Sequence, residues 1–320
     1  MTMQVGVIGG SGFVGGAVIR RLEARSVACR AVTAPRIMSD ADTATSAWSR
    51  EAATVARLAE QLYDCDVIVN CAGNPDASSQ DLKSLFGANG ALPGIVAAAA
   101  RAAGASRYVH VSSAVVQGAA LQLDDSAEVS AFSPYARSKI VGEEAVWEAH
   151  SPDSTIIYRP PSVHSPERRV TRSIRRLARS PLASVMGPGD APTPQAHIEN
   201  VGDAVAELAV TPLRPPEVVI HPWEGWTTGE LMRAFGGGRE PRHIPTRAST
   251  PIRRLLHAVG KFPRLAANAR RVEMMWYGQQ QAPSWLTAQG WVPVVERQGW
   301  LDMIAEMGQE PQDREDQPHD

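Results

Sequence analysis

The chain has 320 residues, of which 43% are hydrophobic and 21% are charged, and its formal net charge is −2. This balance is that of an ordinary globular protein, and it excludes a strong electrostatic attraction to nucleic acid or to an anionic membrane. The longest apolar runs, such as GIVAAAA, fall far short of the roughly 20 residues that span a bilayer.

The beginning of the chain shows no charged leader with a cleavage site, which predicts a cytoplasmic protein rather than a secreted one. The cysteines Cys29, Cys65 and Cys71 are odd in number and lack the spacing of a metal site. They lie in or beside apolar, strand-like segments. We therefore expect small buried side chains in a reducing compartment, and no bound metal.

Short apolar runs alternate with longer helical patterns through the first half of the chain. The predicted strands cover 3–9, 26–32, 66–72, 107–113 and 154–160. The predicted helices between them cover 12–25, 51–63, 81–103 and 134–149. This alternation predicts an α/β fold, a doubly wound parallel sheet of the Rossmann type with helices on both faces. Ligands of such sheets bind outside the carboxyl ends of the strands.

Beyond residue 160 the rhythm loosens, because proline and glycine become dense, as in MGPGDAPTP. Helices are predicted at 168–180, 200–210 and 228–235. We expect a dinucleotide-binding domain over 1–160, a smaller and partly interwoven substrate-binding lobe over 161–308, and a disordered polar tail over 309–320.

A glycine-rich turn joins the first predicted strand to the first helix in VGVIGGSGFVGGAVIRRL. Gly9, Gly12 and Gly15 are spaced three residues apart, and Gly10 with Gly12 and Gly15 fits the tighter dinucleotide fingerprint. Such a turn leaves space for a pyrophosphate, and the amide groups at the start of the helix favour its charge. The pattern predicts dinucleotide binding; the alternative is a glycine turn that binds nothing.

The end of the second strand decides between NAD and NADP, because a carboxylate there would hold the 2′-hydroxyl of the NAD ribose. The segment AVTAPRI has Thr33 and Arg36 at this point, and no acid before Asp40. A hydroxyl and a guanidinium suit a 2′-phosphate. We therefore predict NADP, with NAD as the alternative if Arg36 simply points into solvent.

Tyr135 and Lys139 stand four residues apart in SPYARSK, at the start of a predicted helix. This spacing puts both side chains on one helical face, and with three lysines in the chain it is rarely met by chance. A tyrosine donates its proton poorly at neutral pH, so an adjacent ammonium is expected to lower the tyrosine pKa and make it a usable acid or base. Ser112 and Ser113 end the preceding strand and could hold a substrate oxygen.

Together these residues resemble the extended short-chain dehydrogenase/reductase family, also called the NAD-dependent epimerase/dehydratase family. The resemblance extends to NCAG at 70–73, YRPPSV at 158–163, HIENVGDAV at 197–205 and the C-terminal QGWVPVVERQGWLDMI. It implies an NAD(P)-dependent oxidoreductase in which Tyr135 is the general acid/base and Lys139 holds the nicotinamide ribose. The implied cofactor contacts are Gly9, Gly12, Phe13, Val14, Gly15, Thr33, Arg36, Cys71, Ala72, Gly73, Tyr135, Lys139 and Pro160.

The match of SAVVQG to the family's S-A-x-V-Y-G pattern selects Ser113 over Ser112 as the catalytic hydroxyl. Family 4,6-dehydratases carry an Asp-Glu pair just after that hydroxyl. Ala114 and Val115 stand there in this chain, so dehydration is not expected. Gln117 replaces the usual tyrosine of the same pattern.

The resemblance also implies a set of substrate contacts. His164 lies in VHSP, where the family has VYGP, and could contact substrate or make a structural hydrogen bond. Arg172 belongs to the arginine-rich run ERRVTRSIRRLARS, which could grip a diphosphate as small-lobe arginines of the family do, or could be merely solvated. The substrate contacts expected on this basis are Asn89, Ser113, His164 and Arg172.

These observations predict reduction of a keto group with NADPH, on a nucleoside-diphosphate 4-keto-6-deoxyhexose, as in the deoxysugar ketoreductases of the family. Three alternatives stay open: a sugar nucleotide 4-epimerase with tightly bound NAD, a reductase of another small ketone, and a regulator or scaffold without chemistry. Family members often pair through two helices that correspond to 81–103 and 134–149, so the resemblance implies a homodimer.

Overall fold

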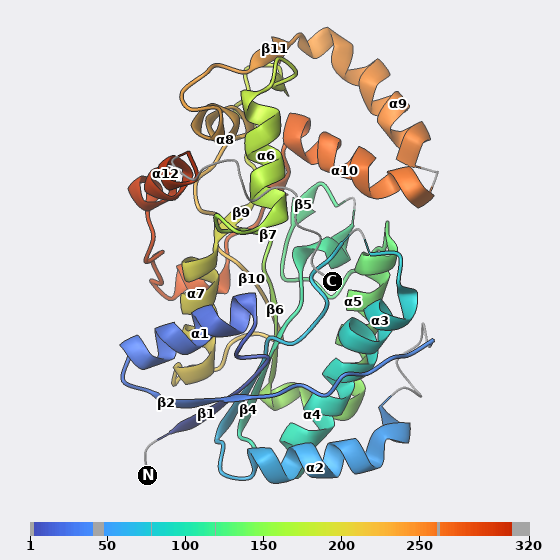
Figure 1. Cartoon of the computed structure of the whole chain (residues 1–320), viewed down its shortest axis with the longest axis vertical. Coiled ribbons are helices and arrows are strands. Elements are labelled where there is room, and N and C mark those ends of the chain that lie inside the picture. The colour runs from blue at the N-terminus through green and yellow to red at the C-terminus, as the bar shows by residue number, and fades with distance from the viewer. Residues whose placement is uncertain (1–2, 41–47, 78, 119, 261–262, 309–320) are drawn as a thin grey trace.

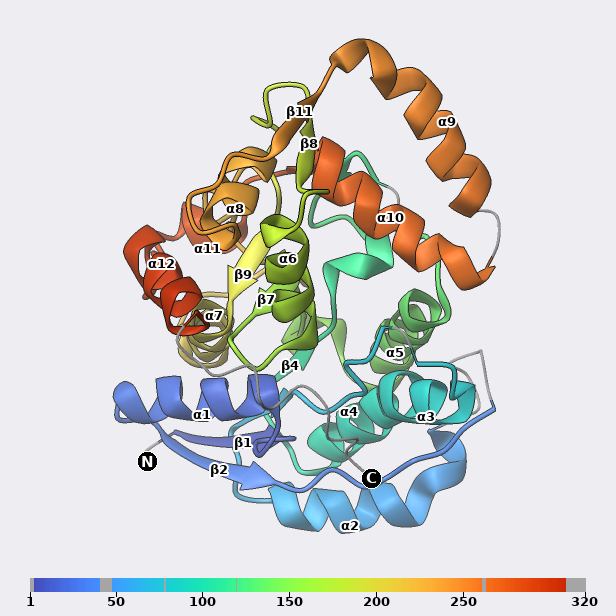
Figure 2. The ribbon, with the colours of Figure 1, turned by 45° about the horizontal axis from the view of Figure 1, so that its top comes forward.

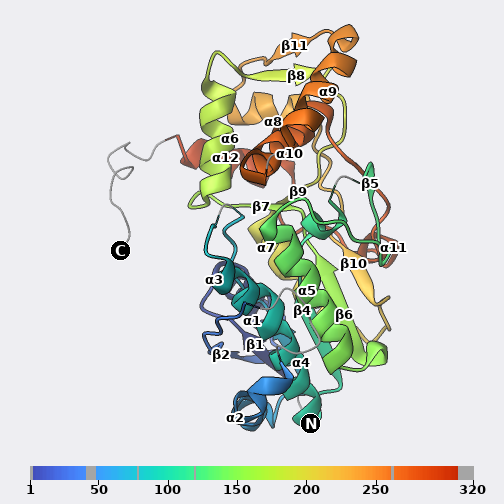
Figure 3. The same ribbon diagram turned by 90° about the vertical axis from the view of Figure 1, so that its right-hand side faces the viewer.

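The computed structural model describes residues 3–40, 48–77, 79–118, 120–260 and 263–308. Figure 1 shows two parts, a larger one around a β-sheet in the lower half and a smaller one above it. The smaller part lies over one end of the strands, as the side view of Figure 3 shows. This arrangement places a second layer of structure over the ends of the strands, where ligands of parallel sheets bind.

The sheet of the described chain has six strands, all parallel, in the order β10-β6-β4-β3-β1-β2. The five runs predicted as strands are confirmed, and β10 was not predicted because three residues show no period. The doubly wound Rossmann-type fold is therefore confirmed. The strands are β1 (Gln4–Ile8), β2 (Ala28–Val32), β3 (Val67–Asn70), β4 (Arg107–Val111), β6 (Thr155–Arg159) and β10 (Val218–Ile220).

Helices cover both faces of the sheet, as buried parallel strands require (Figure 2). On one face α1 (Phe13–Ala24) packs against α7 (Ile198–Val210). The other face is covered by α2 (Ala52–Leu62), α4 (Leu92–Ala102) and α5 (Pro134–Ala149). A hydrophobic cluster fills each of the two interfaces, built mainly from valine, isoleucine, leucine and alanine.

The predicted helix 81–103 consists of α3 (Leu82–Phe86), a π-helical segment (Gly87–Ala91) and α4. Small residues let α4 approach its neighbours so closely that it is buried from Leu92 to Ala100 within the single chain. Pairing with a second copy through this helix would need surface that the described chain already covers, and the homodimer stays a prediction.

The smaller part is built from short elements. Its helices are α6 (Arg169–Arg179), α8 (Thr228–Phe235), α9 (Ser249–Gly260), α10 (Pro263–Tyr277) and α12 (Arg297–Glu306). The short helix α11 (Trp285–Ala288) follows α10 in the chain and packs beside β10 of the large sheet. Three two-stranded parallel sheets accompany them: β8 (Ser184–Met186) with β11 (Arg242–Ile244), β7 (Ser162–His164) with β9 (Gln195–His197), and β5 (Gln122–Leu123) with β12 (Gln280–Gln281).

The chain crosses between the two parts more than once. After β9 it returns to the large sheet as α7 and β10, and only then forms α8. The helices α6, α7 and α8 lie where they were predicted, whereas the α9–α10 hairpin was not predicted. The domain division at residue 160 stays a prediction, and the tail 309–320 lies outside the described residues. None of the helices in the described segments is both long enough and apolar enough to cross a membrane.

Candidate active site

The glycine turn lies between β1 and α1 and is shaped by contacts that exclude side chains. Gly9 has a positive φ of 75°, and a Cβ there would lie 2.9 Å from the backbone of Ala72. A Cβ on Gly15 would lie 2.2 Å from the carbonyl oxygen of Gly9. Gly12 is the N-cap of α1, and no side chain caps this helix. The amide groups of its first turn, which begins with Phe13, are thus left for an anion.

The turn after β3 forms the next wall of the site. Asn70 shapes it, because its side-chain oxygen accepts a hydrogen bond from the Ala72 amide at 3.1 Å. A Cβ on Gly73 would lie 3.4 Å from the Nζ atom of Lys139, so this turn reaches from the glycine turn to α5. Burial raises the pKa of the Cys71 thiol to about 12, which keeps it protonated and unsuited to act as a nucleophile.

Tyr135 lies in the first turn of α5, and the local sequence explains why the helix begins there. Ser133 is the N-cap and accepts a hydrogen bond from the Ala136 amide at 3.1 Å, while Pro134 occupies the first helical position. These signals fix the start of α5 at the predicted residue. The phenol is thereby placed at the end of the helix nearest the carboxyl ends of the strands.

The two serines after β4 face different partners. The side chain of Ser113 lies close enough to the Tyr135 phenol to act on its pKa, which it lowers. Ser112 is buried and donates its hydroxyl hydrogen to the Glu143 carboxylate. The structure therefore brings Ser113 rather than Ser112 to the phenol, in agreement with the register predicted from SAVVQG.

Lys139 lies one turn after Tyr135 and is 6% exposed. Its Nζ atom donates a hydrogen bond to the Val111 carbonyl oxygen at 3.3 Å, at the end of β4. Burial lowers the pKa of Lys139 to about 8, although the Glu143 carboxylate acts in the opposite direction. The ammonium is therefore held beside the turns after β3 and β4, where a dinucleotide ribose would lie.

The ionisation of Tyr135 differs from the prediction. Burial raises the pKa of Tyr135 above its ordinary value, so the predicted net lowering of this pKa is wrong. The positive charge that opposes burial is the guanidinium of Arg168, and the nearby side chain of Ser113 acts in the same direction. The physical reason is that removal of the phenol from water outweighs these favourable contacts. Lys139 meanwhile directs its ammonium at the Val111 carbonyl oxygen.

A buried ion pair joins α5 to the sheet beside the site. The guanidinium of Arg159 binds both carboxylate oxygens of Glu143, with Nη2 at 2.7 Å and Nε at 3.0 Å, and both side chains are almost completely buried. Glu143 lies one turn after Lys139 on α5, and Arg159 ends β6. This bidentate pair locks α5 to the sheet and so fixes where Tyr135 and Lys139 stand.

Glu143→Gln is expected to lower the free energy of unfolding by about 3–5 kcal/mol, because Arg159 would remain buried without a compensating charge. Urea denaturation at neutral pH measures the change. The matched control is Asp153→Asn in the exposed pair with Arg214, where no measurable change is expected. Equal stability of Glu143→Gln and the wild-type protein would contradict this account.

Two predicted substrate contacts are fully buried. Asn89 accepts a hydrogen bond from the Asn74 amide at 2.8 Å and donates one to Ser138 Oγ at 3.2 Å, which ties the loop after β3 to α5. The ring nitrogens of His164 bond to Thr171 Oγ1 at 3.0 Å and Gln195 Oε1 at 2.7 Å. Burial lowers the pKa of His164 to about 4, so the ring is neutral. The structural hydrogen bonds considered for His164 are present; the substrate contacts stay predictions.

The remaining predicted contacts lie at the rim or in the frame of the site. Arg172 is exposed on α6 and donates to the Glu167 carbonyl oxygen at 2.6 Å. Gln117 stands where the family pattern has tyrosine. It is buried and forms hydrogen bonds to Asp124 through both the nitrogen and the oxygen of its side-chain amide. The Pro160 carbonyl oxygen accepts a hydrogen bond from the residue after Ser113.

The segment after β2 carries the two residues predicted to contact a 2′-phosphate. Thr33 and Arg36 are exposed on the segment that follows the strand. Asp40, the first acid in this segment, forms an ion pair with Lys83 at 3.2 Å. A hydroxyl and a guanidinium therefore stand nearest to the strand end.

Two charged residues of the site were not predicted. Arg168 is the N-cap of α6, and its Cζ atom lies 4.7 Å from the centroid of the Phe13 ring. The arginine run drew attention to α6, but helical periodicity does not reveal which arginine faces the cleft. Glu143 could have been found, because it follows Lys139 by four residues and so shares its helical face.

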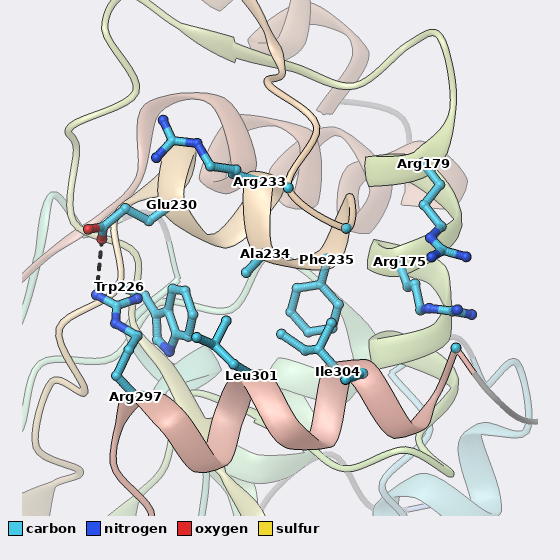
Figure 4. A pocket seen from close by; sticks show the side chains of 14 residues that line it. Arg175, Arg179, Trp226, Glu230, Arg233, Ala234, Phe235, Arg297, Leu301 and Ile304 are labelled. Atoms are coloured by element: carbon cyan, nitrogen blue, oxygen red, sulfur yellow. Dashed lines mark hydrogen bonds and ion pairs between the residues drawn. The ribbon is translucent and has the colours of Figure 1, made fainter.

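A separate pocket of about 480 Å³ lies in the smaller part, between α6, α8 and α12 (Figure 4). Arg175 and Arg179 of α6 extend toward it from one side, and Arg297, paired with Glu230 at 3.2 Å, lies on the other. None of Ser113, Tyr135 and Lys139 lines this pocket, so it is distinct from the candidate active site.

The model of the NAD dependent epimerase/dehydratase family matches residues 5–219. The chain belongs to this family. The matched segment contains the glycine turn together with Ser113, Tyr135 and Lys139, and this family member is thus an NAD(P)-dependent enzyme. Curated protein sequences gave no match.

Solved structures with a similar fold include proteins of different activities. Human epimerase family protein SDR39U1 (isoform 2) with NADPH has a TM-score of 0.64 at 21% identity, covering 95% of this chain and 99% of that one. UDP-glucuronic acid 4-epimerase from Bacillus cereus with NAD has a TM-score of 0.63 at 17% identity, covering 96% and 99%. dTDP-4-dehydrorhamnose reductase from Bacillus anthracis with NADP has a TM-score of 0.62 at 14% identity, covering 96% and 98%. At these identities the likeness shows the fold of this family member and transfers no activity.

Proposed function

We propose that this protein is an NADP-dependent ketoreductase that acts on a nucleoside-diphosphate 4-keto-6-deoxyhexose. The observation that carries the proposal is the proximity of Ser113, at the end of β4, to the Tyr135 phenol, with the Lys139 ammonium one turn further along α5. Burial raises the pKa of Tyr135, so the phenol is protonated at neutral pH and suited to donate a proton to a keto oxygen. A reductase of this substrate class, dTDP-4-dehydrorhamnose reductase, is among the solved structures that share the fold.

The proposed roles follow from where each side chain stands. Reduced nicotinamide dinucleotide supplies a hydride to the keto carbon when it is bound. Ser113 donates a hydrogen bond to the keto oxygen and orients it toward the phenol. Tyr135 then gives its proton to that oxygen, which completes the alcohol. Lys139 holds the ribose hydroxyls near the nicotinamide, and Arg172 on the exposed face of α6 is available to a substrate diphosphate.

The preference for NADP is assigned to the end of β2. Arg36→Ala is expected to weaken NADPH binding about tenfold or more while leaving NADH binding unchanged, because a charge-assisted hydrogen bond to the 2′-phosphate is lost. Calorimetric titration of both dinucleotides measures this. Arg57→Ala, a change at an exposed arginine of α2, is the matched control. Equal losses for both dinucleotides, or a wild-type protein that prefers NADH, would overturn the assignment.

The reaction itself is tested by following NADPH absorbance while candidate substrates are supplied. A dTDP- or UDP-linked 4-keto-6-deoxyhexose is expected to be reduced with much higher kcat/KM than small ketones without a nucleotide. Efficient reduction of a small ketone, with no reduction of the nucleotide-linked sugar, would contradict the proposed substrate class. Absence of NADPH oxidation with every keto compound would contradict the proposed ketoreductase activity.

The same assay separates reduction from 4-epimerisation. A reductase converts one NADPH to NADP for each alcohol formed and releases it. An epimerase runs the hydride both ways on a retained cofactor, so it produces no net change in absorbance. Interconversion of a nucleoside-diphosphate hexose and its 4-epimer without added cofactor would favour the epimerase.

A further inference from the structure

Arg168 reaches from the smaller part to the glycine turn. Its Cζ atom lies 4.7 Å from the centroid of the Phe13 ring, and Phe13 is the first residue of α1, directly after Gly12. A guanidinium over an aromatic face is held by the ring while its N–H donors point elsewhere. Arg168 therefore brings N–H donors to the N-terminus of α1, which no side chain caps.

One of these donors lacks a partner. The Nε atom of Arg168 is buried and has no hydrogen-bond acceptor within the described residues. Burying a cationic N–H group without an acceptor costs free energy, and a group left in this state calls for an explanation. A ligand oxygen that arrives from outside the chain would satisfy this donor.

The charged neighbours of Arg168 define the space that such a ligand would occupy. The guanidinium interacts electrostatically with Tyr135, at the start of α5, and with Asp76, in the loop after β3. Phe13 adds the start of α1. The contact with Phe13 is a direct one, whereas Tyr135 and Asp76 act on Arg168 through longer-range electrostatic interaction. All three partners lie after carboxyl ends of strands, so Arg168 faces the side of the sheet that carries the glycine turn and the phenol.

That side of the sheet is where a dinucleotide binds in this fold, with its pyrophosphate at the glycine turn. A cleft of about 650 Å³ is lined by Gly12 and Phe13 of the glycine turn and by Glu167, the residue before Arg168. The acidic side chains Glu199, Asp302 and Glu306 also line this cleft and would repel a phosphate. The position of Arg168 over Phe13, rather than this cleft, therefore indicates where a pyrophosphate would lie.

We propose that Arg168 is a cofactor-binding residue contributed by the smaller part, whose guanidinium donates hydrogen bonds to the pyrophosphate of the bound dinucleotide. Two phosphate oxygens suit the fork of its N–H groups, and the contact holds the smaller part over the glycine turn. Cofactor binding would then help to bring the substrate-binding elements to Tyr135. The proposal rests on the proposed function only in its choice of NADPH as the dinucleotide.

The test compares two ligands that differ in the pyrophosphate. Arg168→Met is expected to weaken NADPH binding about tenfold or more, and to leave binding of adenosine 2′-monophosphate, which lacks the pyrophosphate, unchanged. Arg168→Lys should recover part of the loss, because it restores the charge without the fork. Arg169→Met, a change at the adjacent exposed arginine, should bind both ligands as the wild-type protein does. Calorimetric titration of each purified variant gives the dissociation constants.

Each outcome decides between distinct conclusions. Equal NADPH binding by Arg168→Met and the wild-type protein would overturn the role of Arg168 and leave the ketoreductase proposal standing. Equal weakening of both ligands would also overturn it, since that result indicates damage to the fold rather than loss of one contact. A wild-type protein that binds NADH but not NADPH would overturn the proposed function; the same comparison with NADH and adenosine monophosphate would still test Arg168.

Discussion

Tyr135→Phe is expected to lower kcat/KM for ketone reduction by about 10²–10⁴-fold, the usual contribution of a positioned general acid. The variant keeps the ring and removes the proton that the reaction needs. NADPH binding should change far less than kcat/KM, since the glycine turn and Lys139 are assigned to the dinucleotide and Phe keeps the ring of Tyr135. Steady-state assays and calorimetric titration measure the two effects separately.

The pH profile provides a second readout for Tyr135. Burial raises the pKa of this phenol above the ordinary value of 10, so the protonated form persists through neutral and mildly alkaline pH. The phenol should therefore limit reduction only above about pH 10, whereas a decline that begins near pH 8 is expected from the Lys139 ammonium, whose pKa burial lowers to about 8. Tyr63→Phe is the matched control, because Tyr63 is 80% exposed on the larger part. Full activity in Tyr135→Phe would remove the catalytic assignment.

The sheet and the start of α5 could be predicted from sequence because their signals are local. Strands β1, β3, β4 and β6 are runs of buried apolar residues, and α5 begins with a serine cap followed by proline. The glycine turn could be predicted for the same reason, since contacts within a few residues, such as that between Gly15 and Gly9, forbid side chains.

Features that depend on distant parts of the chain were missed. The three residues of β10 form a strand because β6 offers its edge, and nothing in their own pattern shows this. The raised pKa of Tyr135 reflects burial of the phenol in the folded chain, which the four-residue spacing to Lys139 does not reveal. Arg168 faces Phe13 only because α6 is docked over the glycine turn, more than 150 positions away in sequence. Spacing arguments found the helix but could not choose among its arginines.

Lys139→Met is expected to abolish most activity and yet to stabilise the protein at neutral pH. Activity should fall by about hundredfold or more, because the assigned contact to the nicotinamide ribose is lost. The stabilisation follows from the pKa of Lys139, which burial lowers from 10.5 to about 8. At pH 7 the folded protein thus holds a buried ammonium that water would solvate better, at a cost of about 3 kcal/mol. An apolar side chain of similar length removes this cost.

The pH dependence gives the sign of this effect. Below about pH 8 Lys139 is charged in both the folded and the unfolded protein, so the full cost is present. Between about 8 and 10.5 the folded protein has released the proton while the unfolded chain retains it, so wild-type stability gains on that of Lys139→Met. Urea denaturation across this range should show the advantage of the variant shrinking as pH rises. Lys83→Met, at an exposed lysine, should show no such trend. A variant less stable than wild type at pH 7 would contradict this prediction, because it would mean that Glu143 and the Val111 carbonyl oxygen fully compensate the buried ammonium.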